Sequence, residues 1–121
     1  MLKKILVIDD DPGVHLLLTP LLTKAGYMVT SSRTGEQGLH TALSGRPQLI
    51  LLDVIMPGIK GRELCAKIKA YDVLKDIPVV FLTAKDSPDD IEAEQAVGGR
   101  GHLTKPIDAA EVLSTIKSII G

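Results

Sequence analysis

Acidic, hydroxyl and ammonium side chains follow short apolar stretches at several points along the chain. Asp9 and Asp10 come after KILVI, Asp53 comes after QLILL, and Thr83 and Lys105 follow two later stretches. Carboxylates held close together repel one another, and a hard divalent cation that prefers oxygen ligands, such as Mg²⁺, relieves that repulsion. If these side chains meet, the threonine and the lysine can contact phosphate oxygens. The chemistry that fits is phosphoryl transfer onto a carboxylate.

The apolar stretches predict the strands that would carry these side chains. They are residues 4–8, 27–31, 48–52, 77–82 and 101–104. The segments between them have the periodicity of amphipathic helices. The first helix is expected to bury a single apolar face made of Val14, Leu17, Leu18, Leu21, Leu22 and Ala25.

Capping residues support the same helices. Asp11, Thr34, Ser87 and Asp108 stand where N-caps are expected, and Pro12 follows the first of them. Strands that alternate with helices predict one parallel sheet with helices on both faces. In such a sheet the functional crevice lies beyond the carboxyl ends of the strands, where the strand order reverses, so the polar side chains above are expected to converge there.

The composition narrows the function classes. The chain has 121 residues, 45% of them hydrophobic, which predicts one globular domain over residues 1–121. A net charge of −1 and 2% aromatic residues give no reason to expect direct nucleic acid binding or attraction to a membrane. The single cysteine, Cys65, excludes an intrachain disulfide and a cysteine-based zinc cluster and is interpreted as a small hydrophobic residue on a helix. We expect a cytoplasmic protein, because the apolar run after the first lysines is too short for a signal peptide.

Four motifs, in this order, carry a resemblance to a known family: ILVIDDDP, LILLDVIMPGIKG, VVFLTA and HLTKP. Together they resemble the response-regulator receiver domain of two-component signalling, and the resemblance covers essentially the whole chain. It implies a single-domain flavodoxin-like (βα)5 fold with a parallel five-stranded sheet in the order 2-1-3-4-5. It also implies self-catalysed phosphotransfer and slow autodephosphorylation rather than turnover as an enzyme.

The resemblance assigns a role to each residue of the acidic group. Asp53 is implied to accept a phosphoryl group from a phosphohistidine of a histidine kinase or histidine phosphotransfer protein. Mg²⁺ is the implied cofactor, with Asp10 and Asp53 as direct ligands and Asp9 acting through a metal-bound water. The backbone carbonyl of Ile55 is implied to complete the protein ligands.

The remaining motif residues are implied to sense the phosphoryl group. Thr83 is expected to hydrogen-bond it and Lys105 to pair with it, with a cis bond between Lys105 and Pro106. In the family an aromatic residue usually stands three positions before this lysine and moves inward with the threonine. This chain has His102 there, for which a switch role and a plain packing role are both open. An unidentified target is expected to bind the face of the fourth helix, fifth strand and fifth helix.

Two other functions could use a similar site or the same fold. An Mg²⁺-dependent aspartyl-phosphate phosphohydrolase of the haloacid-dehalogenase type needs a general-acid aspartate two residues after the nucleophile. Ile55 stands at that position, and the chain has no room for a cap domain. A flavin-binding electron carrier is disfavoured because an acidic pocket repels the flavin phosphate and few aromatic residues are available to stack on the ring.

Several other polar residues are expected to have no part in the chemistry. Asp11 is interpreted as a helix cap, and Asp89 and Asp90 as a solvated first turn that favours the helix dipole. His15 and His40 are expected to lie on the surface.

Overall fold

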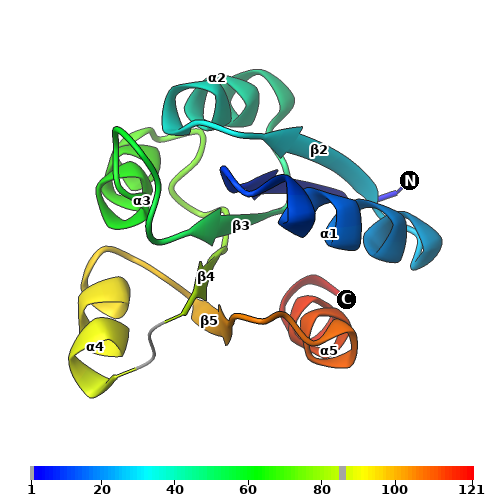
Figure 1. The fold of residues 1–121 in the computed structure, drawn as a ribbon. Coiled ribbons are helices and arrows are strands. Elements are labelled where there is room, and N and C mark those ends of the chain that lie inside the picture. Colours follow the sequence, from blue (N-terminus) through cyan, green and yellow to red (C-terminus); the bar gives the residue numbers. More distant parts are fainter. Residues whose placement is uncertain (1, 85–86) are drawn as a thin grey trace.

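The strands form one parallel sheet, which confirms the predicted order (Figure 1). The computed structural model describes residues 2–84 and 87–121. The strands are β1 (Lys4–Ile8), β2 (Met28–Ser32), β3 (Leu49–Asp53), β4 (Val79–Thr83) and β5 (Gly101–Thr104). Their order in the sheet is β2-β1-β3-β4-β5, so the strand order reverses between β1 and β3.

Helices cover both faces of this sheet. They are α1 (Pro12–Lys24), α2 (Gly35–Gly45), α3 (Gly61–Ala70), α4 (Pro88–Ala96) and α5 (Ala109–Ile120). In Figure 1, α2, α3 and α4 lie on one side of the sheet and α1 and α5 on the other. None of these helices, in the part of the chain that the structure describes, is long and apolar enough to cross a membrane.

The predicted N-caps are confirmed. The side chains of Asp11, Thr34, Ser87 and Asp108 each accept a hydrogen bond from a backbone N–H in the first turn of the following helix. Each bond satisfies a backbone donor that has no partner within its helix. These caps therefore fix where four of the helices begin, close to the strand ends that precede them.

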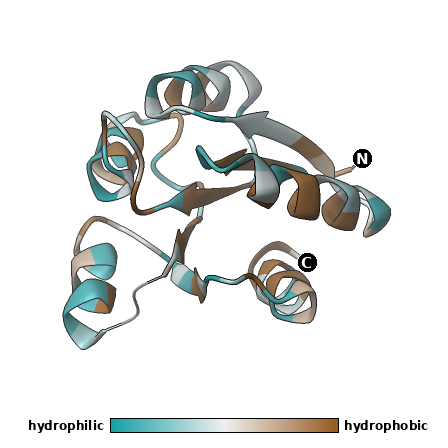
Figure 2. Ribbon diagram, in the orientation of Figure 1, coloured by the Kyte–Doolittle hydropathy of each residue, from teal (hydrophilic) through white to brown (hydrophobic). Residues whose placement is uncertain are grey.

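Two separate apolar cores hold the layers together, because alternate residues of a strand point to opposite faces. Leu6 and Ile8 of β1 pack in one core, while Ile5 and Val7 pack in the other. The first core contains side chains of α2 and α3, and the second contains side chains of α1 and α5. The inner strands β3 and β4 are accordingly coloured mostly as hydrophobic in Figure 2, whereas the edge strand β2 is not.

The structure corrects two expectations. The buried face of α1 is narrower than expected, because it consists of Val14, Leu18 and Leu22, while Leu17 is 42% exposed. Three strands are shifted by one or two residues from the expected limits. β2 begins one residue later than expected because the N–H of Tyr27 donates to the carbonyl of Leu22. Tyr27 is therefore part of the turn that ends α1.

The first and last elements of the chain meet at one place. The ammonium of Lys3, just before β1, donates a hydrogen bond to the backbone carbonyl of Ile120, the last residue of α5. The start of a central strand and the end of the last helix are therefore held side by side.

Candidate functional site

Three carboxylates converge where the strand order reverses, as the sequence predicted. Asp9 and Asp10 follow β1, and Asp53 is the last residue of the neighbouring β3. One carboxylate oxygen from each lies within 4.8 Å of the others. Asp9 is fully buried and Asp53 is 5% exposed, while Asp10 is half-buried. The group is therefore a compact acidic pocket rather than a solvated strand end.

The ammonium of Lys105 reaches into this pocket from the edge of the sheet. Its Nζ lies 2.9 Å from Asp9 Oδ2 and 3.4 Å from Asp53 Oδ1. The backbone N–H of Lys105 donates to the carbonyl of Thr83 at 2.7 Å, which continues the β4–β5 pairing beyond the strands. The following peptide bond, Lys105–Pro106, is cis. One cation thus bridges carboxylates that come from two different strands.

The electrostatic balance of the pocket raises the pKa of Asp53 to about 6. Burial is the main cause, and repulsion from Asp9 adds to it, while attraction to Lys105 and the N–H of Ile55 oppose the shift. Burial also lowers the pKa of Lys105, but its hydrogen bond and attraction to Asp9 and Asp53 outweigh this, so the net shift is upward. Lys105 therefore stays charged, and Asp53 is ionised mainly above about pH 6.

The donor set fits a hard divalent cation. The carboxylates of Asp9, Asp10 and Asp53 supply oxygen ligands, and an ion between them would cancel the repulsion that raises the pKa of Asp53. Asp9 Oδ2 is buried, and among the described residues no hydrogen bond reaches it apart from the ionic contact with Lys105. The N–H of Ile55 donates to Asp53 Oδ1 at 3.2 Å, which fixes the carboxylate, and the Ile55 side chain is 60% exposed. The role of the Ile55 carbonyl stays a prediction.

A close approach of backbone to backbone holds the acceptor strand against α3. The N–H of Gly61, the first residue of α3, donates to the carbonyl of Val54 at 2.9 Å. A Cβ at position 61 would lie 2.0 Å from the carbonyl oxygen of Asp53. Only glycine allows this approach, so the PGIKG segment positions the end of β3 directly.

Thr83 lies at the wall of a cavity beside the pocket. It is the last residue of β4 and is 2% exposed. The cavity, of about 420 Å³, is lined by Thr83, by Val54 and Ile55 just after the acidic strand, and by Lys60, Arg62, Glu63 and Asp90. The hydroxyl residue and the two residues that follow Asp53 thus border the same space.

His102 lies farther along the same sheet. It is half-buried in β5 and stands opposite Phe81 in the strand register, whereas Thr83 stands opposite Thr104. A small cavity separates its side chain from α4, and Glu94 is among the residues that line that cavity. His102 therefore has a charged neighbour, Glu94, that the sequence did not indicate.

Two surface expectations were wrong. His15 is half-buried, and its Nε2 lies 2.7 Å from the backbone oxygen of Asp9. A carbonyl oxygen only accepts, so Nε2 must carry the proton that it donates. Asp90 is not merely solvated, because Arg62 of α3 pairs with it at 3.0 Å. His15 comes one helical turn after the Asp11 cap, and this spacing could have indicated that its side chain reaches back to the end of β1.

Comparisons with known proteins agree with this geometry. The family model for the response regulator receiver domain matches residues 5–117. The chain is 36% identical over 120 residues to the alkaline phosphatase synthesis transcriptional regulatory protein PhoP of Bacillus subtilis (strain 168), covering 99% of this chain but only 49% of PhoP.

Other relatives are matched over almost their whole length. Protein PilH of Pseudomonas aeruginosa is 32% identical over 119 residues, which is 98% of each chain. Sporulation initiation phosphotransferase F of Bacillus subtilis is 33% identical over 120 residues, covering 99% of this chain and 95% of the relative. Among solved structures, the Vibrio cholerae chemotaxis protein CheY4 superposes with a TM-score of 0.96 at 29% identity, covering 99% of this chain and 100% of CheY4. The chain therefore belongs to the response regulator receiver domains, the modules of two-component, phosphorylation-controlled signalling.

Proposed function

We propose that Asp53 accepts a phosphoryl group from a phosphohistidine of a partner histidine kinase or histidine phosphotransfer protein. One observation carries the proposal: the Asp53 carboxylate ends a buried strand with oxygens of Asp9 and Asp10 within 4.8 Å and the ammonium of Lys105 at 3.4 Å. Membership of the receiver family supports it, as does similarity to a relative named as a phosphotransferase.

In the proposed reaction the ionised Asp53 is the nucleophile. A carboxylate oxygen forms a bond to phosphorus while the phosphorus–nitrogen bond of the donor breaks, and the imidazole nitrogen keeps that electron pair. Lys105 already lies between Asp9 and Asp53, where it would stabilise negative charge on the transferred group. The N–H of Ile55 holds the attacking carboxylate in place.

We infer that Mg²⁺ binds at the acidic pocket. Asp10 and Asp53 would be direct ligands, Asp9 would act through a metal-bound water, and the backbone carbonyl of Ile55 would complete the protein ligands. When bound, the ion would neutralise the carboxylates and the charge on the transferred group. The buried oxygen of Asp9 and the raised pKa of Asp53 both support a cation here.

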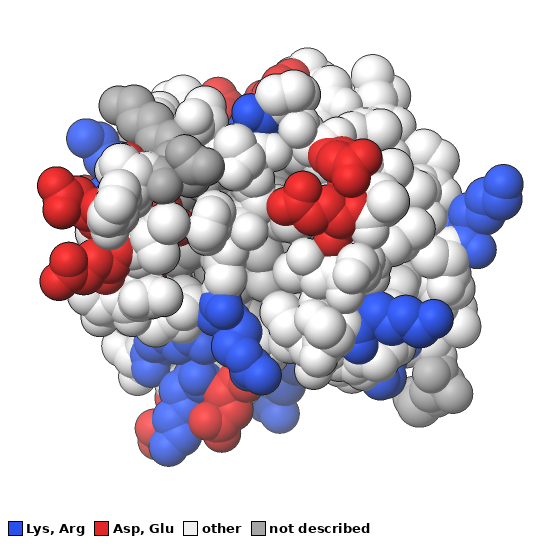
Figure 3. Space-filling model, turned by 90° about the horizontal axis from the view of Figure 1, so that it is seen from below, with Lys and Arg blue, Asp and Glu red and all other residues white. Residues whose placement is uncertain are grey.

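The proposed output is a change on the surface formed by α4, β5 and α5. Thr83 is the last residue of β4, and Lys105 directly follows β5 and contacts Asp53, so a group added to Asp53 would act at the ends of both strands. Figure 3 looks at this surface and shows acidic side chains over α4, whose exposed acids include Asp89 and Glu92. A mostly uncharged surface separates α4 from α5 in the same view.

We further propose that residues 1–121 act as one receiver domain in the cytoplasm, through protein partners rather than by direct contact with nucleic acid. The net charge of −1 supports protein partners. The chain spans about half the length of PhoP and nearly all of PilH.

The acceptor assignment is tested by phosphorylation with acetyl phosphate and Mg²⁺, followed by mass spectrometry. The wild-type protein should gain one phosphoryl group that is stable in acid and released by hydroxylamine. Asp53→Asn should gain none. Asp11→Asn is the matched control, since Asp11 is an exposed carboxylate beside the pocket that caps α1, and an asparagine can still cap it. Undiminished uptake by Asp53→Asn would refute the assignment.

A further inference from the structure

A carboxylate is buried beneath α4 without a hydrogen bond. Glu94 is 3% exposed, and both of its carboxylate oxygens are buried and accept no hydrogen bond from the described residues. Its place follows from spacing, because Glu94 comes three residues after Ile91 and three before Val97, on the side of α4 that faces the protein. A buried carboxylate is costly unless a cation compensates it, so the charges around Glu94 have consequences for α4.

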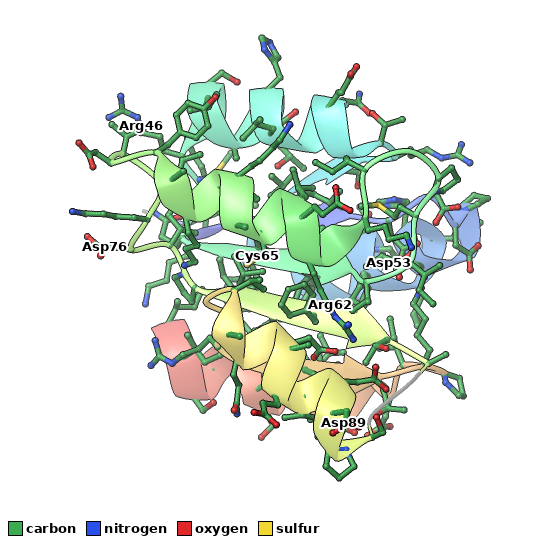
Figure 4. The ribbon with its side chains drawn as sticks, turned by 90° about the vertical axis from the view of Figure 1, so that its left-hand side faces the viewer. Arg46, Asp53, Arg62, Cys65, Asp76 and Asp89 are labelled. Carbon is green, nitrogen blue, oxygen red and sulfur yellow. The ribbon has the colours of Figure 1, made fainter. Side chains whose placement is uncertain are left out.

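Arg62 is the first cation near Glu94. Its Nη2 lies 3.8 Å from Glu94 Oε2 and 3.0 Å from Asp90 Oδ1, so one guanidinium from α3 contacts both acids of α4. Figure 4 shows the Arg62 side chain extending from α3 toward α4. Arg62 also lines the cavity bordered by Thr83 and by the residues that follow Asp53. The same guanidinium thus contacts the buried carboxylate and borders the cavity that begins just after Asp53.

His102 is the second group near Glu94 that can carry positive charge. The two side chains line one small cavity of about 20 Å³, together with Ile91 and the backbone of Gly99 and Gly101. Burial raises the pKa of Glu94, and attraction to His102 and to Arg62 opposes that shift, while Asp90 adds to it. Of the residues that line this cavity with His102, Glu94 is the charged one, while Arg62 of α3 and Asp90 of α4 act on Glu94 from a different cavity. The Phe81 side of β4 is uncharged.

We propose that Glu94 is a positioning residue that exchanges its cationic partner on phosphorylation, from Arg62 in the unphosphorylated domain to His102 in the phosphorylated one. The inference rests on the proposed function. A phosphoryl group adds roughly −1.5 to −2 charges, which would attract the guanidinium that borders the neighbouring cavity. Glu94 would then be left uncompensated in the interior, and His102, on taking up a proton from solvent, would replace Arg62 as its counter-ion.

The exchange would move β5 relative to α4. A small cavity now separates His102 from Glu94, and closing it draws the imidazole toward the helix. The surface formed by α4, β5 and α5 would change with it. In this domain, therefore, ionic pairing would do what insertion of an aromatic ring does in domains with tyrosine or phenylalanine at this position.

Double-mutant cycles test the exchange directly. The variants are Arg62→Met, His102→Gln and Glu94→Gln, alone and in pairs, and the readout is the equilibrium constant of unfolding in denaturant. Each is measured in Mg²⁺ with and without saturating beryllofluoride as the phosphoryl mimic. We expect the Arg62–Glu94 coupling to be about fivefold in the free domain and to fall below about twofold on loading, with the Glu94–His102 coupling changing in the opposite direction.

Glu92→Gln provides the matched control, since it removes the same charge from an exposed position on the same helix. It should couple to neither Arg62 nor His102 in either state. An Arg62–Glu94 coupling that is equal with and without beryllofluoride would overturn the exchange.

A second measurement needs no substitution at the buried carboxylate. In the wild-type protein at neutral pH, the ring-nitrogen NMR signals of His102 should move toward imidazolium values when beryllofluoride binds. Signals that do not move would overturn the exchange even if the variants failed to fold. Failure of the proposed function would be different, because the wild-type protein would then neither bind beryllofluoride nor take up phosphate from acetyl phosphate.

Discussion

Asp53 has to be ionised to act as a nucleophile, yet its surroundings favour the protonated form. Burial and the neighbouring Asp9 raise its pKa from 3.8 to about 6, in spite of Lys105. The unfolded chain lacks these neighbours, so its aspartate ionises near the ordinary value. Between these two values the folded protein holds a proton that the unfolded chain has lost. The free energy of unfolding therefore falls as the pH rises and Asp53 becomes ionised in the folded protein.

This linkage predicts a pH-dependent effect of removing the charge. In a chelator, the Asp53 contribution should lower the free energy of unfolding by up to about 3 kcal/mol between about pH 4 and pH 7, because each unit of pKa shift corresponds to about 1.4 kcal/mol. Asp53→Asn should abolish that part of the decline and be more stable than wild type at pH 7. Urea denaturation across this pH range measures it, with Asp11→Asn as the control. Profiles for wild type and Asp53→Asn that stay parallel would contradict the prediction.

The residues with a predicted chemistry were easier to find from the sequence than the residues that are merely buried. Asp9, Asp10 and Asp53 could be placed together because each stands at a strand end, and strand ends follow from hydrophobic runs. The contact between Arg62 and Glu94 could not be predicted in this way, because it depends on how α3 and α4 pack against each other. The sequence of α4 has four acids and little apolar periodicity, so it did not mark position 94 as internal.

At the scale of elements, the junction between β3 and α3 is the most constrained connection of the site. A Cβ on Gly61 would lie 2.0 Å from the carbonyl oxygen of Asp53, so any side chain there must push α3 away from the strand end. The same helix carries Arg62, Leu64 and Cys65, which pack toward α4 and into the core. Displacing α3 would therefore disturb both the acceptor and its neighbours.

Gly61→Ala should consequently destabilise the fold by roughly 1–3 kcal/mol, as overpacking does, and should slow phosphorylation of Asp53 by acetyl phosphate. Denaturant unfolding and the rate of phosphoryl uptake measure the two effects. The matched control is Gly45→Ala at the end of α2, where an added Cβ meets nothing within 4 Å. That variant should be as stable as wild type or slightly more stable. If Gly61→Ala behaves like Gly45→Ala, the close approach does not constrain the site.

The order of elements was predictable from the sequence for physical reasons. Capping residues such as Asp11 and Thr34 satisfy backbone donors locally, so they mark helix starts without any knowledge of the fold. Exact strand limits and the buried face of α1 were less predictable. Leu17 has the spacing of a buried residue, but the space over the sheet is taken by Val14, Leu18 and Leu22.

For the molecule as a whole, the acidic pocket is a source of instability that a cation would relieve. If Mg²⁺ binds the folded domain and not the unfolded chain, it should raise the free energy of unfolding by ~2.7 kcal/mol at a hundredfold excess over its dissociation constant. Asp10→Ala should lose this response, and its melting temperature without metal should equal or exceed that of wild type, because one repelling charge is gone.

Thermal unfolding with a series of Mg²⁺ concentrations tests this prediction. Glu36→Gln is a suitable control, because it removes an exposed carboxylate from the start of α2, outside the acidic group. It should keep the full response to Mg²⁺. An Asp10→Ala protein that is stabilised by Mg²⁺ as strongly as wild type would show that Asp10 is not a ligand.

The hydrogen bond between Lys3 and the carbonyl of Ile120 has a consequence for the unfolded chain. Because Lys3 and the end of α5 are already in contact in the folded domain, a peptide linker could join the chain on either side of them into a ring. A ring has fewer unfolded conformations than an open chain, and the entropy lost depends only weakly on its length. Backbone cyclisation would therefore stabilise this domain through its unfolded state, without altering any contact at the phosphorylation site.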